Sequence, residues 1–104
     1  MPIRSNVSGD SHELLVSGKI DGDLANQLEV QILAAIKAGA REIFINLSEA
    51  DFLCSAGIRV IMQYWRQMKN QGKRLMVTRP SAAVGKVLEM TGFSAAIVEG
   101  AAPA

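Results

Sequence analysis

The chain has 104 residues and a formal net charge of +1, with 49% hydrophobic and 20% charged residues. This length suits one compact domain with a single core, and the composition is that of an ordinary globular protein. The balanced charge argues against nucleic-acid binding, and one cysteine with one histidine cannot supply a zinc site.

The N-terminal residues Met1 to Asn6 lack the apolar core of a signal peptide. No later apolar run approaches the ~20 residues that a membrane span requires. We therefore expect a cytoplasmic protein with no membrane contact. Residues 1–100 are expected to form the domain, and the small residues 101–104 a disordered tail.

A hairpin is predicted at the start of the domain. Two short strand-like segments, 2–7 and 12–17, flank the turn signal Ser8-Gly9-Asp10. Leu14 and Val16 would face the core, and the hairpin would form the antiparallel edge of a sheet.

The first helix is predicted to begin at Asp21 and Asp23 and to end at Gly39. Carboxylates at a helix start accept free backbone N–H groups, so capping explains the two aspartates better than a metal site or an acid/base pair. The predicted core stripe recurs every four residues and consists of Leu24, Leu28, Ile32 and Ile36.

A central strand is predicted over residues 42–47, because apolar and β-branched residues follow one another with little alternation. This pattern is typical of a strand that is covered on both faces. A loop of residues 48–54 would follow, and then a second helix over 55–71 with Gly72 at its end. The apolar stripe of that helix consists of Ile58, Ile61, Trp65 and Met68.

The last third predicts a strand over 74–78, a helix that starts at Pro80-Ser81 and ends at Gly92, and an edge strand at Ile97-Val98. Strands that alternate with helices imply right-handed crossovers between parallel strands. The fold class is therefore α/β: one mixed, mostly parallel sheet of four to five strands with an N-terminal antiparallel edge hairpin and about three to four helices. Functional groups gather at the C-terminal strand ends of such sheets, which points to the 47–55 loop.

Three motifs lie in register with these elements. Residues 43–58 carry an apolar strand and then Cys54-Ser55-Ala56-Gly57-Ile58, residues 17–21 read Ser-Gly-Lys-Ile-Asp, and residues 87–93 read Val-Leu-Glu-Met-Thr-Gly-Phe. Together they resemble the STAS-domain anti-sigma factor antagonist family. The corresponding family motifs are Asp-Ser-Ser/Thr-Gly-Leu, Gly-x-hydrophobic-Asp and Leu-Glu-x-Thr-Gly-Leu, and the similarity spans about residues 12–98.

The resemblance implies a non-enzymatic partner switch that needs no cofactor. In this family the unphosphorylated protein binds an anti-sigma factor, a serine kinase with a GHKL-type ATP site, and thereby frees a sigma factor. The kinase phosphorylates the first serine of the motif, which corresponds to Ser55, and a PP2C-type phosphatase removes the phosphate. We expect the partner to bind at Asp21, Asp23, Cys54, Ser55, Ala56, Gly57, Ile58, Arg59 and Val60.

The position of Ser55 suits this chemistry. A helix start offers free backbone N–H groups and the positive end of the helix dipole, so the fold would tolerate a phosphate there. Roughly −1.5 to −2 added charges would weaken a close-packed interface. Gly57 would let a kinase backbone approach closely. The alternative is that Ser55 only caps the helix.

Two neighbours depart from the family motif. Cys54 replaces the acid, and Ala56 stands where Ser or Thr is common, so one hydroxyl remains for modification. Cys54 is either a redox-sensitive thiolate, which a helix N-terminus favours, or a small apolar filler of the core.

The second helix adds a hint about the partner surface. On a helical projection Val60 falls among the polar residues Gln63, Gln67 and Gln71, where it could contact a partner or be an isolated surface valine. Arg59, with Arg66, would form the charged rim of this surface or simply a solvated face.

Two other functions remain open. A non-switching STAS scaffold or kinase-binding subunit would keep the interface but not the phosphate, and Cys54 would mark that loss. A small-molecule or nucleotide-binding module of flavodoxin-like shape, or an enzyme, belongs to a different class, although the sequence holds no constellation of acid, base and nucleophile.

Overall fold

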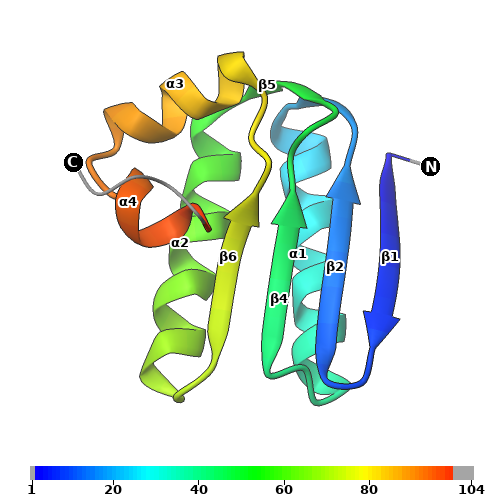
Figure 1. The fold of residues 1–104 in the computed structure, drawn as a ribbon. Helices are drawn as coiled ribbons and strands as arrows, with labels where there is room; N and C mark the ends of the chain where they lie inside the picture. Colours follow the sequence, from blue (N-terminus) through cyan, green and yellow to red (C-terminus); the bar gives the residue numbers. More distant parts are fainter. Residues whose placement is uncertain (1, 100–104) are drawn as a thin grey trace.

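A computed structural model describes residues 2–99 of the chain. The elements are, in chain order, β1 (Ile3–Ser8), β2 (Ser11–Val16), β3 (Gly18–Ile20), α1 (Gly22–Lys37), β4 (Glu42–Asn46), β5 (Ala50–Leu53), α2 (Ser55–Asn70), β6 (Arg74–Thr78), α3 (Ala82–Met90) and α4 (Ser94–Ile97). The main sheet has the order β1-β2-β4-β6, with β1 antiparallel to three parallel strands (Figure 1). The predicted α/β class with an antiparallel edge hairpin is confirmed. The predicted tail, 101–104, lies outside the described residues.

The hairpin of β1 and β2 forms around a two-residue turn. Gly9 takes the first turn position with φ +61°, a conformation that glycine adopts at little cost and that a type II′ turn requires. In β2 the side chains of Leu14 and Val16 are buried, as the alternation predicts.

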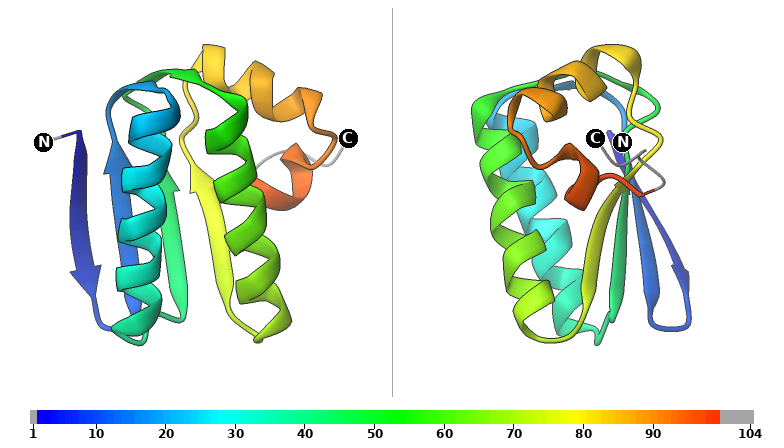
Figure 2. Two further views of the ribbon diagram at one scale, coloured as in Figure 1. Left: turned by 180° about the vertical axis from the view of Figure 1, so that it is seen from behind. Right: turned by 60° about the vertical axis from the view of Figure 1, so that its left-hand side comes forward.

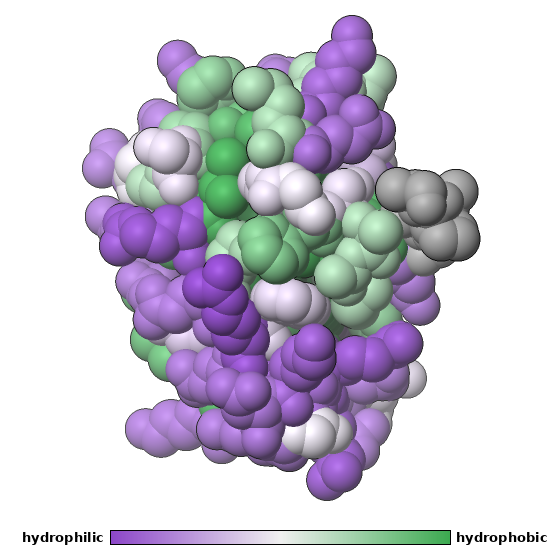
Figure 3. Space-filling model, turned by 90° about the vertical axis from the view of Figure 1, so that its left-hand side faces the viewer, coloured by the Kyte–Doolittle hydropathy of each residue, from purple (hydrophilic) through white to green (hydrophobic). Residues whose placement is uncertain are grey.

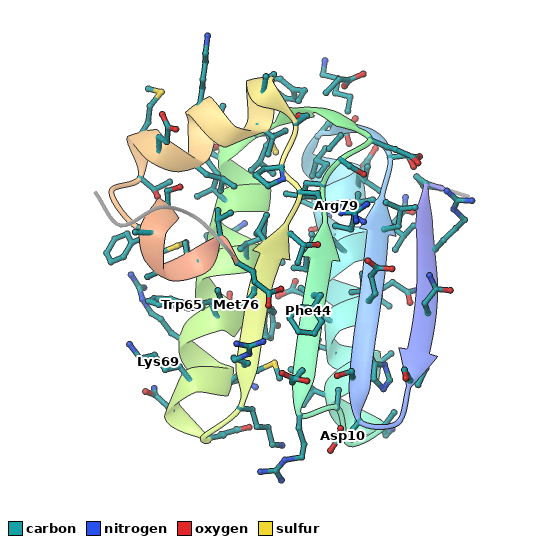
Figure 4. All side chains as sticks on the ribbon, viewed as in Figure 1. Asp10, Phe44, Trp65, Lys69, Met76 and Arg79 are labelled. Carbon is teal, nitrogen blue, oxygen red and sulfur yellow. The ribbon has the colours of Figure 1, made fainter. Side chains whose placement is uncertain are left out.

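Both long helices cover the same face of the sheet, and the opposite face is open (Figure 2). In β4 the side chains of Ile43 and Ile45 are buried beneath the helices, whereas Phe44 is half-buried on the open face (Figure 4). The prediction that this strand is covered on both faces is therefore wrong. An aromatic residue on the open face hid the alternation, and the guanidinium carbon of Arg74 lies 5.4 Å from its ring centroid.

A second, two-stranded sheet lies beside the main one. Strands β3 and β5 pair in parallel and match Ile20 with Leu53, both of them buried. Strand β5 lies within residues 48–54, which the sequence predicts to be a loop. Strands of three and four residues are too short to show a period, which is why the sequence does not reveal them.

Helix α1 begins and ends as predicted. The Asp21 carboxylate accepts the Leu24 N–H at 3.0 Å, and Gly39 follows the helix with φ +93°. Leu24, Leu28 and Ile32 are buried and form the expected stripe.

Helix α2 is rotated from the predicted orientation. Ile61 and Met68 are buried as predicted, but Val60 is only 4% exposed and Tyr64 is buried as well. The placement of Val60 on the polar face is therefore wrong. Because α2 packs against α1 on one side and β6 on the other, its buried arc is wider than the apolar stripe and includes the tyrosine.

The C-terminal segment closes one edge of the sheet. The predicted strand at Ile97-Val98 is wrong, because Ile97 ends α4 and Val98 forms only an isolated parallel bridge to Val77. Residue Glu99 adds a backbone N–H bond of 2.8 Å to the Val77 carbonyl. Among residues 2–99, the helices are all too short or too polar to cross a membrane.

Candidate functional site

Three helices begin at one edge of the molecule, where the parallel strands end (Figure 1). The β3–β5 pair brings the starts of α1 and α2 together, because the Cys54 N–H donates to the Ile20 carbonyl at 3.0 Å. Asp21 and Ser55 are the next residues on the two segments. The fold therefore unites the two motifs that the sequence places far apart.

Ser55 is exposed and is the first residue of α2. Cys54 occupies the N-cap position, and the first intrahelical bond runs from the Ile58 N–H to the Cys54 carbonyl at 3.1 Å. Within residues 2–99 the side-chain hydrogen bonds do not include the Ser55 hydroxyl. The alternative that Ser55 only caps the helix is therefore not supported by the structure.

The start of α2 differs from the starts of its neighbours. Asp21 caps α1, and the Ser81 hydroxyl accepts the Val84 N–H of α3 at 3.3 Å. Cys54 makes no side-chain cap bond, so the first N–H groups of α2 have no side-chain acceptor there. Phosphate oxygens on Ser55 would be well placed to accept from such groups.

A capping residue in place of Cys54 should stabilise the protein. We expect Cys54→Ser to raise the free energy of unfolding by about 1 kcal/mol, because a hydroxyl can accept one of these N–H groups. Urea denaturation measures the change, and Cys54→Ala is the matched control that should lie within a few tenths of a kcal/mol of the parent. Equal stability of the serine and alanine variants would show that the N–H groups are already satisfied.

Gly57 faces the interior and not the solvent. A Cβ atom at this position would lie 2.6 Å from Leu53 Cδ1 and 3.1 Å from Ile20 Cγ2. The prediction that Gly57 leaves room for a kinase backbone is therefore wrong. The missing side chain instead lets α2 start close against the β3–β5 pair.

An apolar surface extends from this edge over α2 and α3 to Phe93, the residue that precedes α4. Figure 3 shows apolar side chains gathered on the upper half of this face, above a hydrophilic lower half. We call it the α2–α4 apolar surface; its members are partly or fully exposed and comprise Ile58, Met62, Trp65, Val87, Met90 and Phe93. Met90 is 86% exposed, and the rings of Trp65 and Phe93 lie 6.0 Å apart.

Of the other predicted partner-binding residues, Asp21, Asp23 and Arg59 are exposed. Cys54, Ala56 and Ile58 are half-buried at the start of α2. Met62, Met90 and Phe93 are not among the partner-binding residues predicted from the sequence. Residues 87–93 contain the last two, but this segment enters the sequence prediction as a helix ending and a family motif, not as a binding surface.

The described residues hold no group of three or more His, Cys, Asp or Glu side chains that could bind a metal ion. Asp21 is engaged as a cap, and Asp23 lies in the first turn of α1. Both positions favour stabilisation of the start of α1 over a metal site or an acid/base pair.

A partly buried hydrogen bond links α1 to α2. The Tyr64 hydroxyl donates to Glu29 Oε2 at 2.7 Å. Burial, and then the bond to the Glu29 carboxylate and its charge, raise the pKa of Tyr64 to about 12. Glu29 is the one charged residue of α1 between Asp23 and Lys37, and this isolated charge is the sequence signal that could have pointed to the pair.

The mixed sheet, the paired starts of α1 and α2 and the exposed serine at the start of α2 define a member of the STAS domain family. The chain belongs to this family: the family model described as "Mlab, STAS domain" matches residues 3–99. Among its relatives are anti-sigma factor antagonists, which are regulatory binding proteins.

Two curated relatives and one protein of known structure are anti-sigma factor antagonists by name. The anti-sigma-B factor antagonist of Staphylococcus aureus is 23% identical over 91 residues, which cover 88% of this chain and 84% of the relative. BtrV of Bordetella bronchiseptica, named as a candidate anti-sigma factor antagonist, is 28% identical over 78 residues, or 75% of this chain and 67% of the relative.

The anti-sigma factor antagonist SpoIIAA has the same fold. Its unphosphorylated form aligns with a TM-score of 0.80 and 23% identity, over 89% of this chain and 83% of SpoIIAA. The phosphorylated form of SpoIIAA from Bacillus aligns with a TM-score of 0.74 and 22% identity, over 89% of this chain and 86% of the other.

Proposed function

We propose that the chain is a cytoplasmic anti-sigma factor antagonist that binds a GHKL-type anti-sigma factor serine kinase and thereby releases a sigma factor. Phosphorylation of Ser55 by that kinase ends the binding, and a PP2C-type phosphatase restores it. The protein acts by binding and not by catalysis, and it makes no direct contact with nucleic acid. The observation that carries the proposal is the exposed Ser55 at the uncapped start of α2.

The surface around Ser55 suits a protein partner. Ala56, Ile58 and Arg59 continue from the serine along the first turns of α2, and the α2–α4 apolar surface begins at Ile58. Exposed apolar surface with a charged rim is typical of protein interfaces. Asp21 and Asp23 supply negative charge beside the serine at the start of α1. Val60 and Gly57 support this surface from beneath and do not touch the partner.

The charge of a phosphate explains the switch. On free protein, a phosphate on Ser55 is solvated and accepts from the N–H groups at the start of α2. In the complex the same group would have to leave water within an apolar interface and lie near the acidic residues of α1. The modified protein therefore stays folded and releases its partner.

Labelling with the cognate kinase and ATP tests the site. We expect phosphate to enter the parent chain and the control variant Ser48→Ala, which alters another exposed serine near the site, and not Ser55→Ala. Labelling that persists in Ser55→Ala would exclude Ser55 as the acceptor.

Binding of the kinase tests the electrostatic account. Ser55→Asp should weaken kinase affinity at least about tenfold, because it places a charge at the interface. Ser55→Asn has nearly the same shape without the charge and should bind like the parent. Equal affinity of the two variants would contradict the account.

One observation favours a second function, a constitutive STAS scaffold or kinase-binding subunit. Cys54 stands where the family motif has an acid. Mass spectrometry of protein from cells would then find Ser55 free of phosphate under all conditions, whereas a switching protein would show both forms.

A further inference from the structure

The two edges of the main sheet differ. At the β6 edge, Val98 bridges Val77, and the Glu99 N–H bonds the Val77 carbonyl. Within residues 2–99 the β1 edge has no such cover, because β1 is the outermost strand and pairs only with β2. An uncovered edge strand presents backbone groups to which another strand can bind.

The ladder identifies the free backbone groups of β1. The Ser17 N–H donates to the Pro2 carbonyl at 2.8 Å, which makes Pro2 and Ser17 a hydrogen-bonded position of the antiparallel pair. Because such positions alternate, Arg4, Asn6 and Ser8 bond to β2. The N–H and C=O groups of Ile3, Ser5 and Val7 therefore point outward.

A second β1 strand fits these groups in one register. If two β1 strands pair antiparallel about a twofold axis at Ser5, then Ile3 lies opposite Val7 of the second copy, and Arg4 lies opposite Asn6 of the second copy. The outward groups then form about six hydrogen bonds between the chains. No like charges face each other, and the apolar Ile3–Val7 pair adds to the strand pairing.

The surface beside β1 combines apolar side chains with polar ones, and Asp, Glu, Lys and Arg are absent from the described lining of its hollows. Two hollows of about 160 Å³ each lie along β1 next to α1. Pro2, Ile3, Gln27, Val30 and Gln31 line the first, and the second lies between Val7 and Ala34. Val7 is 61% exposed and Val30 is 62% exposed. In the register above, Val7 of the second copy lies beside Ile3 and can enter the first hollow.

We infer that the β1 edge is a self-association surface, at which a second copy of this chain continues the sheet and fills the hollows beside α1. The twofold arrangement is self-complementary, as an isologous interface requires. The inference does not depend on the role of Ser55, which lies at the start of α2.

Variants of β1 test this inference in solution. We expect sedimentation equilibrium to show a concentration-dependent dimer of the 11.1 kDa chain. Ser5→Pro should weaken the dimer at least about tenfold, because it removes an outward N–H without removing a bond to β2. Val7→Lys should also weaken the dimer, because it places a charge opposite the apolar Ile3 of the second copy. Ser5→Ala is the control that keeps the outward N–H. A monomer at every concentration, or a dimer that survives both variants, would overturn the inference.

Disulfide cross-linking tests the register. In a Cys54→Ala background, Arg4→Cys and Asn6→Cys chains should form a disulfide when mixed and oxidised. Opposite Cα atoms at this position lie about 4.5 Å apart, within the range of a disulfide. Each variant alone should remain uncross-linked, because like residues on the two copies are then roughly 8 Å apart, beyond that range. Equal cross-linking of the single variants would contradict the proposed pairing.

Discussion

Replacing Val60 with Asp is expected to lower the free energy of unfolding by about 4 kcal/mol or more. The Val60 side chain is only 4% exposed and lies in the core cluster beneath α2. A carboxylate in such a place loses its hydration without gaining a partner. Because small domains are stable by about 5–15 kcal/mol, the variant should be largely unfolded under mild urea, as far-ultraviolet circular dichroism would show.

The neighbouring residue provides the matched control. Arg59 is exposed on the same turn of α2, so Arg59→Asp should change stability by less than about 1 kcal/mol. Val60→Ala is a milder core variant that should fold and lose about 1–2 kcal/mol. If both aspartate variants were equally stable, Val60 would have to lie on the surface, as the helical projection alone predicts.

Stability is expected to fall as the pH rises from about 10 to about 12, and Tyr64→Phe is expected to remove that part of the fall. The pKa of Tyr64 is raised from 10.0 to about 12 in the folded protein, mainly by burial and then by the Glu29 carboxylate. Between these values the unfolded chain loses the hydroxyl proton and the folded protein keeps it. The contribution of Tyr64 to the free energy of unfolding is therefore fully present below pH 10 and is lost as the pH approaches 12.

The chain contains one tyrosine, so ultraviolet absorbance of tyrosinate reports its titration directly. We expect the midpoint in the folded protein to lie well above that of a urea-unfolded sample. Urea denaturation of the parent and Tyr64→Phe over the same pH range isolates this group from the lysines that titrate nearby. At neutral pH the phenylalanine variant should be about 1 kcal/mol less stable, because the bond to Glu29 is lost. If the free energy of unfolding fell equally with pH in the parent and in Tyr64→Phe, the raised pKa of Tyr64 would be contradicted.

Much of the fold follows from signals that lie within a few residues of one another. The Asp21 cap, the glycine after α1 and the apolar period of that helix are local, and each is confirmed. The exposed serine at the start of α2 was likewise readable from its motif. The two short strands beside it were not, because their pairing joins distant segments and their few residues show no alternation.

The errors on α2 share one physical cause. The predicted stripe of Ile58, Ile61, Trp65 and Met68 rests on apolar residues and does not include Tyr64. A tyrosine can be buried when its hydroxyl finds a partner, and Glu29 of α1 supplies one. With Tyr64 inside, Val60 and Gly57 come to face the interior too. The burial of this face depends on the packing of α1 against α2, which the sequence of α2 alone does not reveal.

The β3–β5 pair also has a consequence for the order of folding. It joins two segments that are separated by α1 and β4, so the chain must close a long loop before the pair forms. The hairpin of β1 and β2, by contrast, closes over a two-residue turn and can form early. The surroundings of Ser55 are therefore expected to form later than the hairpin. A partner that recognises this shape would bind folded molecules and not unfolded chains, because the site exists only after β3 and β5 have paired.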